Sequence, residues 1–562
     1  MVVFFLIGTT VFVVALKNET VNRDRLFMVF TCTVSLSLLL SASATSANLL
    51  GWDIHQEYNR FLQVSAEGVW QPGIQQNYNA VLSITILPSI LSTVTAIDGF
   101  QVFKFIFPLL FSLVPLVLYM SYRKLLNAES AFIGVFLFMA YPIYYIELIA
   151  LARQEVAELL LVLLLWVFLS NKIRRRTSGR LLILLLTFGI VTAHYSLAII
   201  YLVIIGFSTA SAFILRKDVA LSSRATFLIS LIFLIIWYGY ATSGSVLFSL
   251  LSFILAVKEG LAFDFFSAAA RPVVAPTTLE SLHFTNAALQ YLVQLILVLG
   301  LLVYIRKGKN EAEKKIFPLV IAGFALVGSS VILPFFSEGL NFGRTYHIAL
   351  MLIAPCFAFG IQSMETVSRR VLSYLGIHVN VVRSRTLGKT RVIAVLILFS
   401  YFLFSSGWVY AAGMSRPSSF ILDSRAMMDS SDASLKAYYF SYATVDQDVV
   451  SAQWLRSHFV NDGLLCADWI SRSQVLTSYG GFPTELSFPL KCEGYLSALK
   501  AGDGRWPISN GTTYVYLSVL NARYGLFTEW GTSNLYEIIR LPHTGVIIME
   551  NKIYSDGGSI YV

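Results

Sequence analysis

Charge is scarce in this sequence of 562 residues: only 13% are Asp, Glu, Lys or Arg, whereas 56% are hydrophobic and 14% aromatic. A soluble domain carries about twice that share of charge. The four cysteines are too few for a disulfide scaffold, and the sequence has no solenoid repeat or low-complexity tail. These shortages exclude an ordinary soluble or disulfide-rich protein and predict a chain that crosses a membrane several times.

The formal net charge of +9 would indicate a nucleic-acid partner in a soluble chain. In a membrane protein, however, the position of Lys and Arg matters more than their sum, because these residues mark the cytoplasmic side. Nucleic acid is therefore not expected as a partner.

Apolar runs predict about twelve membrane helices when the chain is scanned in windows of about 19 residues. The first run has no basic n-region and no small-residue cleavage site, so it is predicted to be a retained helix. The predicted helices lie near residues 1–16, 27–50, 101–121, 131–149, 155–170, 181–198, 199–215, 225–243, 289–305, 316–335, 346–363 and 392–412.

Basic residues fall in every second loop of this arrangement, and those loops are predicted to be cytoplasmic. The clusters are Arg23 and Arg25; Arg123 and Lys124; Lys172, Arg174, Arg175, Arg176 and Arg180; Arg216 and Lys217; 306–315; and 369–391. The chain is thus predicted to be a multi-pass protein of the cell membrane with both termini outside.

Two apolar segments are not assigned as spans. A crossing within 64–100 would reverse the charge bias of every later loop, so this segment is predicted to lie on the outer surface as an amphipathic element. Residues 245–263 are interpreted in the same way. The outer loops 51–100 and 244–288 would then roof a cavity above the membrane.

The composition changes after residue 413. Residues 1–413 are predicted to form the membrane domain, and 414–562 a small extracytoplasmic α/β or α+β domain with short strand-like runs between Gly, Pro and Asn. Outside the cell, Cys466 and Cys492 could form a disulfide, and the sequon beginning at Asn510 could be glycosylated.

Polar residues gather at the start of the first outer loop: Asp53, His55, Glu57 and Arg60. Asp53 and Glu57 are four residues apart and share one face if the loop enters a helix there. Two carboxylates beside an imidazole can act as a general base toward a hydroxyl or bind a divalent cation. The alternative is a solvated helix end with no chemical role.

Two more outer positions carry polar groups. Arg153 and Glu155 lie where the chain re-enters the membrane, and they either contact substrate or only pair with each other as a helix cap. Glu147 is a weaker candidate. His194 and Tyr195 lie at an outer helix end, where a lone His is more often a hydrogen-bonded structural residue.

Arg344 and His347 precede an apolar run near the headgroup level. A planar guanidinium beside Gly343, which allows close backbone approach, suits recognition of a lipid phosphate; the alternative is a snorkelling anchor. The long outer loop also holds residues whose spacing assigns them no role: Lys258, Asp264, Arg271, Glu280 and His283.

This order of parts resembles the GT-C superfamily of integral-membrane glycosyltransferases. More narrowly, GWDIHQEY at 51–58, HYS at 194–196, an Arg before a helix with Ala-Pro, and the ending NKIYSDGGSIYV look like an uncharacterised archaeal membrane family usually grouped with those enzymes. The resemblance implies a multi-pass GT-C fold with Asp53 as the base. Because the first outer loop has no Asp-x-Asp pair, a requirement for Mg or Mn, held by Asp53, Glu57 and Glu155, stays open.

An outward-facing transferase needs a lipid-linked donor, because nucleotide sugars are too polar to cross the bilayer. The predicted function is an inverting transfer of sugar from a polyprenyl- or dolichyl-phosphate-linked donor to a glycan, glycolipid or protein acceptor, in surface glycan or glycoprotein assembly. Asp53 would act as base and Arg344, with His347, would stabilise the leaving phosphate. The residues predicted to bind or orient the substrates are His55, Glu57, Arg153, Glu155, His194 and Tyr195.

Two other classes of protein remain as alternatives. A transporter or flippase for lipid-linked glycans would carry charges in mid-helix along a path and often shows paired halves, of which the sequence has few signs. A non-catalytic membrane receptor or scaffold would leave the charged outer loops unexplained.

Overall fold

The structure is a computed structural model. It describes residues 1–16, 23–174, 176–214, 224–263, 281–307, 311–336, 340–374, 383–413, 416–460, 463–482, 492, 512–530, 536–541, 552–555 and 559–561.

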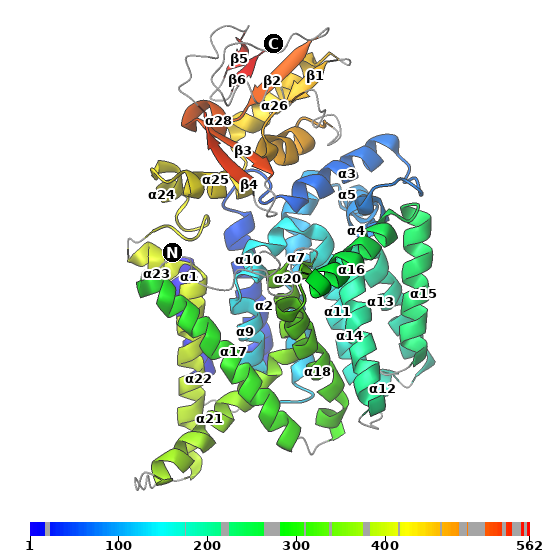
Figure 1. The fold of residues 1–562 in the computed structure, drawn as a ribbon. Coiled ribbons are helices and arrows are strands. Elements are labelled where there is room, and N and C mark those ends of the chain that lie inside the picture. Colours follow the sequence, from blue (N-terminus) through cyan, green and yellow to red (C-terminus); the bar gives the residue numbers. More distant parts are fainter. Residues whose placement is uncertain are drawn as a thin grey trace.

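Long apolar helices lie side by side and form the lower two thirds of the molecule in Figure 1. Apolar side chains cover most sides of these helices, as expected where both neighbouring helices and lipid surround them. The helices are α1 (Val2–Leu16), α2 (Arg23–Ser43), α7 (Phe107–Phe111), α8 (Val114–Tyr122), α9 (Ala128–Ala140), α11 (Ala152–Leu169), α12 (Asn171–Arg174), α13 (Thr177–Ala193), α14 (Tyr195–Ile214), α15 (Arg224–Ala241), α17 (Ser281–Lys307), α18 (Glu311–Ile332), α20 (Phe342–Ile353), α21 (Pro355–Tyr374), α22 (Arg383–Ser405) and α23 (Trp408–Ala412).

Six helices of the described ranges are long and apolar enough to cross a membrane, or eight spans if each of two bent pairs counts as one. Several other apolar helices are shorter, and α11 carries Arg153, Glu155 and Glu158 within its 18 residues. The predicted count of twelve therefore stays a prediction, although each predicted range overlaps a helix.

Two of the predicted membrane helices are broken at prolines. The range 131–149 bends by 60° between Ala128–Ala140 and Ile143–Ala150, and 346–363 bends by 71° between Phe342–Ile353 and Pro355–Met364. Pro142 and Pro355 lie at the breaks, where a proline lacks the N–H that a continuous helix needs. The first break forms α10 (Ile143–Ile146) and η3 (Leu148–Ala150).

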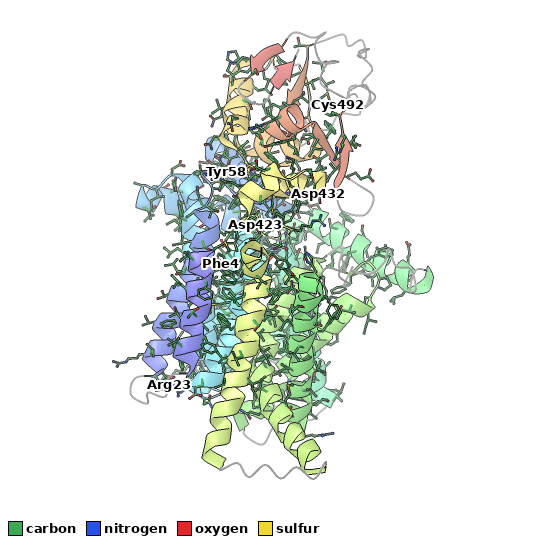
Figure 2. The ribbon with its side chains drawn as sticks, turned by 90° about the vertical axis from the view of Figure 1, so that its left-hand side faces the viewer. Phe4, Arg23, Tyr58, Asp423, Asp432 and Cys492 are labelled. Atoms are coloured by element: carbon green, nitrogen blue, oxygen red, sulfur yellow. A yellow bond between two sulfur atoms is a disulfide. The ribbon has the colours of Figure 1, made fainter. Side chains whose placement is uncertain are left out.

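Shorter elements cross one end of the bundle. They are α3 (Asp53–Glu67), η1 (Asn77–Ala80), α4 (Leu82–Thr85), α5 (Leu87–Thr95), α6 (Gly99–Gln101), η2 (Val102–Ile106) and α16 (Ser245–Phe263). Figure 1 shows α3 lying across the ends of the long helices, and in Figures 1 and 2 α16 projects from the bundle rather than running along it. By length and composition alone, however, Ser245–Ala262 also qualifies as a span.

The chain after Gly413 forms helices and two small sheets above this end (Figure 1). Strands β1 (Leu464–Cys466), β2 (Thr513–Leu517), β6 (Ser559–Tyr561) and β5 (Lys552–Ser555) form one sheet in the order β1-β2-β6-β5, with only the β1–β2 pair parallel among these strands. Strands β3 (Leu526–Trp530) and β4 (Tyr536–Arg540) pair separately. The helices are α24 (Ser424–Asp429), α25 (Ala433–Tyr442), α26 (Asp446–His458), η5 (Ser471–Leu476) and α28 (Val519–Tyr524).

The structure joins Cys466 and Cys492 in a disulfide. Asn510 and Gly511 of the sequon lie outside the described residues. The exact boundary at residues 413 and 414 stays a prediction.

Contacts of Gly51 and Trp52 with the C-terminal part fix the start of α3. The N–H of Gly51 donates to the carbonyl of Tyr442 at 2.7 Å, and Trp52 packs edge-on against Trp469 with ring centroids 4.3 Å apart. Gly51 has φ +90°, and a Cβ there would lie 2.3 Å from the Cβ of Ala150. Glycine is therefore required at this close approach, which sets Asp53 beside the bend after α9.

Candidate active site

Asp53 is the first residue of α3, and two arginines from distant parts of the chain face its carboxylate. Oδ2 lies 3.0 Å from Nη2 of Arg344, which is 291 residues away in the sequence. Oδ1 lies 3.4 Å from Nη2 of Arg153 and accepts a hydrogen bond of 3.2 Å from the hydroxyl of Tyr78. The side chain of Asp53 keeps 25% of its surface exposed.

Arg153 and Glu57 form the buried part of the site. Nη1 of Arg153 lies 2.6 Å from Oε1 of Glu57, and the backbone N–H of Arg153 donates to Oε2 at 3.2 Å. The two side chains are 4% and 0% exposed. Because Asp53 and Glu57 are four residues apart on one helix, both carboxylates reach the same guanidinium.

Three rings hold the guanidinium of Arg153 in place. It lies over the rings of Tyr78 and Tyr195, 4.8 and 5.7 Å from their centroids, and Nε donates to Nε2 of His194 at 3.3 Å. Cation–π contacts of a desolvated guanidinium are stronger than those at a surface. His194 and Tyr195 therefore act on this site through Arg153.

Arg344 lies in the first turn of α20, where Asn341 accepts a hydrogen bond from its backbone N–H at 3.2 Å and caps the helix. Its Nε lies 3.4 Å from Oε2 of Glu147, which follows α10 at the first helix break. Arg344, Asp53 and Glu147 are each about a quarter exposed. The site therefore has a buried half around Arg153 and an open half around Arg344.

The arginines determine the protonation of Asp53. Burial by itself would raise its pKa, but the charges of Arg153 and Arg344, with hydrogen bonds from Arg344 and Tyr78, hold the pKa of Asp53 well below its usual range. Asp53 is consequently an ionised carboxylate with two counterions.

Three predicted site residues lie elsewhere. His55 is fully buried between α3 and the C-terminal part, with Nδ1 2.7 Å from the hydroxyl of Ser478. His347 is also fully buried, stacked on Phe138 at 4.2 Å with Nδ1 3.6 Å from Oε2 of Glu158. Both carboxylate oxygens of Glu155 are buried, and no described residue hydrogen bonds to them. None of the three faces the open half, because each side chain points into protein packing.

The loop residues without an assigned role stay apart from this site. His283 packs against Tyr410, with ring centroids 4.8 Å apart, and Lys258 lies on the projecting helix α16. Asp264, Arg271 and Glu280 lie outside the described residues.

The predicted carboxylate set does not fit a divalent cation. Both oxygens of Asp53 face arginines, Oε1 of Glu57 binds Arg153, and the buried oxygens of Glu155 have no hydrogen-bond partner among the described residues. A hard cation needs several oxygens that converge on one point. In the part of the chain that the structure describes, no group of three or more His, Cys, Asp or Glu side chains is arranged in that way. No step of the mechanism is therefore derived through a metal.

Two residues of the site were missed or ranked low from the sequence. Tyr78 was not predicted, because a tyrosine is common in an aromatic stretch of this kind. Glu147 was only a weaker candidate, although its position indicates a site: it is an acidic residue five positions after Pro142, at a break in an apolar run.

His55 gives a testable pH dependence of stability. Burial lowers its pKa from 6.5 to about 3. Between these values the unfolded chain binds a proton that the folded chain does not, so stability is complete above about pH 6.5 and falls as the pH drops toward 3. We expect a slope of at most about 1.4 kcal/mol per pH unit from this group.

The measurement is the apparent Tm in detergent micelles from pH 7 to pH 4. His55→Gln should flatten the loss of Tm on acidification, whereas His458→Gln, on an exposed residue of α26, should keep the wild-type slope. An unchanged slope in His55→Gln would contradict the assignment.

A family model described as "Predicted membrane protein (DUF2206)" matches residues 179–561, more than half of the chain. The chain belongs to this family. No curated protein sequence matches the DUF2206 chain.

Solved structures resemble the DUF2206 chain over nearly its whole length. The Archaeoglobus fulgidus oligosaccharyltransferase, tethered to an acceptor peptide with an NVT sequon, has a TM-score of 0.50 at 14% identity, covering 93% of this chain and 75% of that one. ArnT from Cupriavidus metallidurans, bound to undecaprenyl phosphate, has a TM-score of 0.45 at 12% identity. The match covers 96% of this chain and 98% of ArnT. The arabinofuranosyltransferase AftD from Mycobacteria has a TM-score of 0.45 at 11% identity. The match covers 96% of this chain and 40% of AftD.

The likeness to the oligosaccharyltransferase gives the fold of this DUF2206 protein, which is that of the GT-C glycosyltransferases. The GT-C resemblance predicted from the sequence is confirmed. The family description and the apolar helices also agree that it is a membrane protein.

Proposed function

We propose that this protein is an inverting glycosyltransferase that moves a sugar from a polyprenyl- or dolichyl-phosphate-linked donor to an acceptor on the outer face of the cell membrane. The observation that carries the proposal is the pairing of Asp53 with Arg344 at 3.0 Å in the open half of the site. The reaction needs a base on one face of the anomeric carbon and a phosphate-binding cation on the other, so both groups must border one opening and their ion pair must separate when the sugar binds between them.

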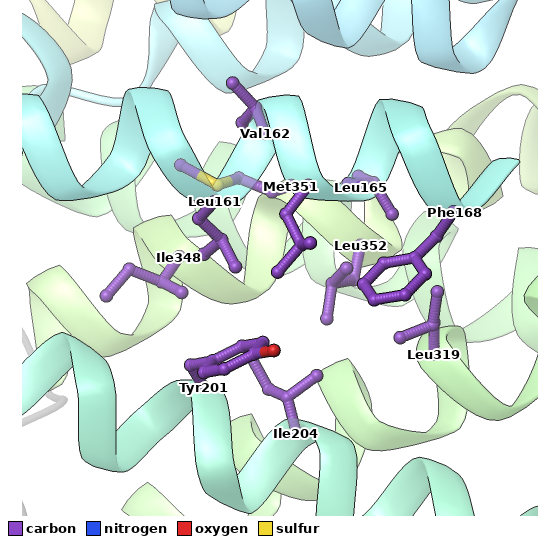
Figure 3. A pocket seen from close by; sticks show the side chains of 11 residues that line it. Leu161, Val162, Leu165, Phe168, Tyr201, Ile204, Leu319, Ile348, Met351 and Leu352 are labelled. Atoms are coloured by element: carbon purple, nitrogen blue, oxygen red, sulfur yellow. The ribbon is translucent and has the colours of Figure 1, made fainter. Parts of the chain in front are cut away.

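The helix that carries Arg344 also lines a small apolar cavity of about 20 Å³ between α11, α14, α18 and α20 (Figure 3). Ile348, Met351 and Leu352 of α20 line it; they follow Arg344 by four, seven and eight residues and so lie near the same helix face. Met351 is about 10 Å deeper along the helix than Arg344. This cavity is too small to hold a lipid tail, so it supports the proposal only as part of an apolar helix face that continues below Arg344.

The chemistry is a single displacement. The acceptor hydroxyl attacks the anomeric carbon while its proton passes to the carboxylate of Asp53. The new bond from carbon to the acceptor oxygen forms as the bond to the phosphate oxygen breaks, and the lipid phosphate leaves with that electron pair. Arg344 stabilises the negative charge that develops on the phosphate, and the anomeric configuration inverts.

The distribution of basic residues supports the proposed orientation. Arg23 lies at the end of the bundle opposite Tyr58 of α3 and the disulfide residue Cys492 (Figure 2), and α12, with Lys172 and Arg174, lies at that far end in Figure 1. Basic ends are cytoplasmic by the positive-inside rule. The site, the N-terminal end of α1 and the sheets would then face outward, where the disulfide can persist.

The C-terminal part adjoins α3 through Trp469 and Ser478, so we assign it a role in binding the acceptor, which is a glycan, glycolipid or protein. The test is an assay of the purified protein in lipid nanodiscs with a panel of polyprenyl-phosphate sugars, in which released polyprenyl phosphate and glycosylated acceptor are both measured. Stoichiometric appearance of both products is expected. Movement of the lipid-linked sugar between leaflets without transfer would support a flippase instead.

A further inference from the structure

Asp53 has two counterions that differ in how firmly they are held. Arg153 is 4% exposed and is fixed by Glu57, His194 and the rings of Tyr78 and Tyr195. Breaking a buried pair of this kind leaves an uncompensated charge in the protein interior. Arg153 is therefore a permanent partner of the site.

Arg344 is held far less firmly. It is 28% exposed, and its partners Asp53 and Glu147 are 25% and 24% exposed. Its guanidinium is divided between two carboxylates, with Nη2 3.0 Å from Asp53 and Nε 3.4 Å from Glu147. Ion pairs that are partly open to solvent contribute less stability than fully buried pairs, so another anion can displace either carboxylate at a smaller cost than it could displace the partners of Arg153.

We propose that Arg344 is an exchangeable counterion, which a phosphate group takes from Asp53, so that Asp53 is released as a base only when the lipid phosphate is bound. Glu147 is the positioning residue that keeps Arg344 at the opening before the phosphate arrives. This inference rests on the proposed function and adds a regulation of the same site. A phosphate offers several oxygens to the planar guanidinium and forms charge-assisted pairs with it.

The exchange has a predictable electrostatic consequence. The charged and titratable groups around Asp53 are Glu57 on its own helix, Tyr78 on η1, Glu147 after α10, Arg153 on α11, His194 and Tyr195 at the start of α14, and Arg344 on α20. Among these described groups, Arg153 and Arg344 are the cations, and Arg344 is the one partly open to a ligand. When it turns to a phosphate, the pKa of Asp53 rises and its carboxylate becomes a better proton acceptor. Without a donor, the base stays paired.

A binding experiment tests the exchange without requiring turnover. The probe is farnesyl monophosphate, with uncharged farnesol as its control, and affinity is measured at fixed pH and salt on the full chain in detergent. Wild type should bind the phosphate more tightly than the alcohol, and Arg344→Gln should lose that preference. Asp53→Asn and Glu147→Gln should each bind the phosphate up to about fivefold more tightly, because a competing carboxylate has been removed. Glu67→Gln, an exposed residue at the end of α3, should match wild type.

A double-mutant cycle separates exchange from general electrostatics. The gain from Asp53→Asn should disappear when Arg344 is already Gln, because no shared guanidinium remains. A gain that persists in the Arg344→Gln background, or no gain in either background, would overturn the inference. Monodispersity and Tm of each variant show that it is folded, and Arg344→Lys, which keeps the charge, should retain part of the phosphate preference.

Kinetics give a second readout once a donor has been found. The pH dependence of kcat/KM reports the free enzyme and that of kcat reports the bound complex. The acidic limb of kcat should lie at higher pH than that of kcat/KM in wild type, and coinciding limbs would contradict the exchange. If the double-mutant cycle shows coupling in phosphate binding but no sugar is transferred, the exchange at Arg344 is supported and the proposed glycosyltransferase function is wrong.

Discussion

Replacement of Asp53 by Asn is expected to lower the rate of sugar transfer about a hundredfold to ten-thousandfold, the usual contribution of a general base. Asparagine keeps the size of the side chain but cannot accept the proton of the attacking hydroxyl. Because Arg344 and Tyr78 contact the carboxylate at an open edge of the site, the fold should survive the change. The loss should appear in kcat, and binding of the lipid phosphate should not weaken.

Single-turnover transfer in nanodiscs is the appropriate measurement, because it reports the chemical step rather than product release. Glu67→Gln is the matched control, since it removes a carboxylate from the same helix at an exposed position. A transfer rate for Asp53→Asn within about threefold of the control would show that the base is another group, since a general base contributes far more.

Replacement of Arg153 by Met should have the largest effect on stability, a loss of about 3–5 kcal/mol in the free energy of unfolding. The reason is Glu57, which is 0% exposed and has Arg153 at 2.6 Å. Without the guanidinium, its carboxylate is left charged in the interior or must take up a proton. Activity should be lost too, because the carboxylate of Asp53 is no longer held in place by Arg153.

The double variant Arg153→Met/Glu57→Gln separates these causes. Removing both charges should recover a large part of the lost stability, because no unpaired buried charge remains. Unfolding is followed by denaturant titration in micelles, with Arg180→Met as a control at an exposed arginine of α13. If the double variant is no more stable than Arg153→Met, the loss comes from packing of the side-chain stem rather than from charge.

Much of the site was visible in the sequence as separate parts. Charge spacing indicated that Asp53, Arg153, His194 and Arg344 belong to outer helix ends, and the i,i+4 spacing predicted that Asp53 and Glu57 share a face. Such statements depend on local periodicity and on where charge is tolerated in a membrane. They do not say which loop ends meet.

The tertiary structure decided the partners. His55 is two residues from Asp53, yet it packs against Ser478, 423 residues away, because it lies on the side of α3 that meets the C-terminal part. His347 is only three residues after Arg344, but this is almost one turn deeper along α20, where it stacks on Phe138. Neighbours in the sequence are thus divided between the site and the protein interior.

The sequence by itself determined that this is a membrane protein with an acidic stretch at Asp53 and Glu57, because composition and apolar length are properties of the chain alone. The GT-C fold was implied only by the resemblance to that superfamily. Only the tertiary structure decided that Asp53 is held by one buried and one partly exposed arginine and that Glu147 shares the partly exposed one. Those pairings arise from two proline breaks and a glycine contact that bring distant helix ends to one edge of the bundle. No periodicity in the sequence indicates which of these distant helix ends come into contact.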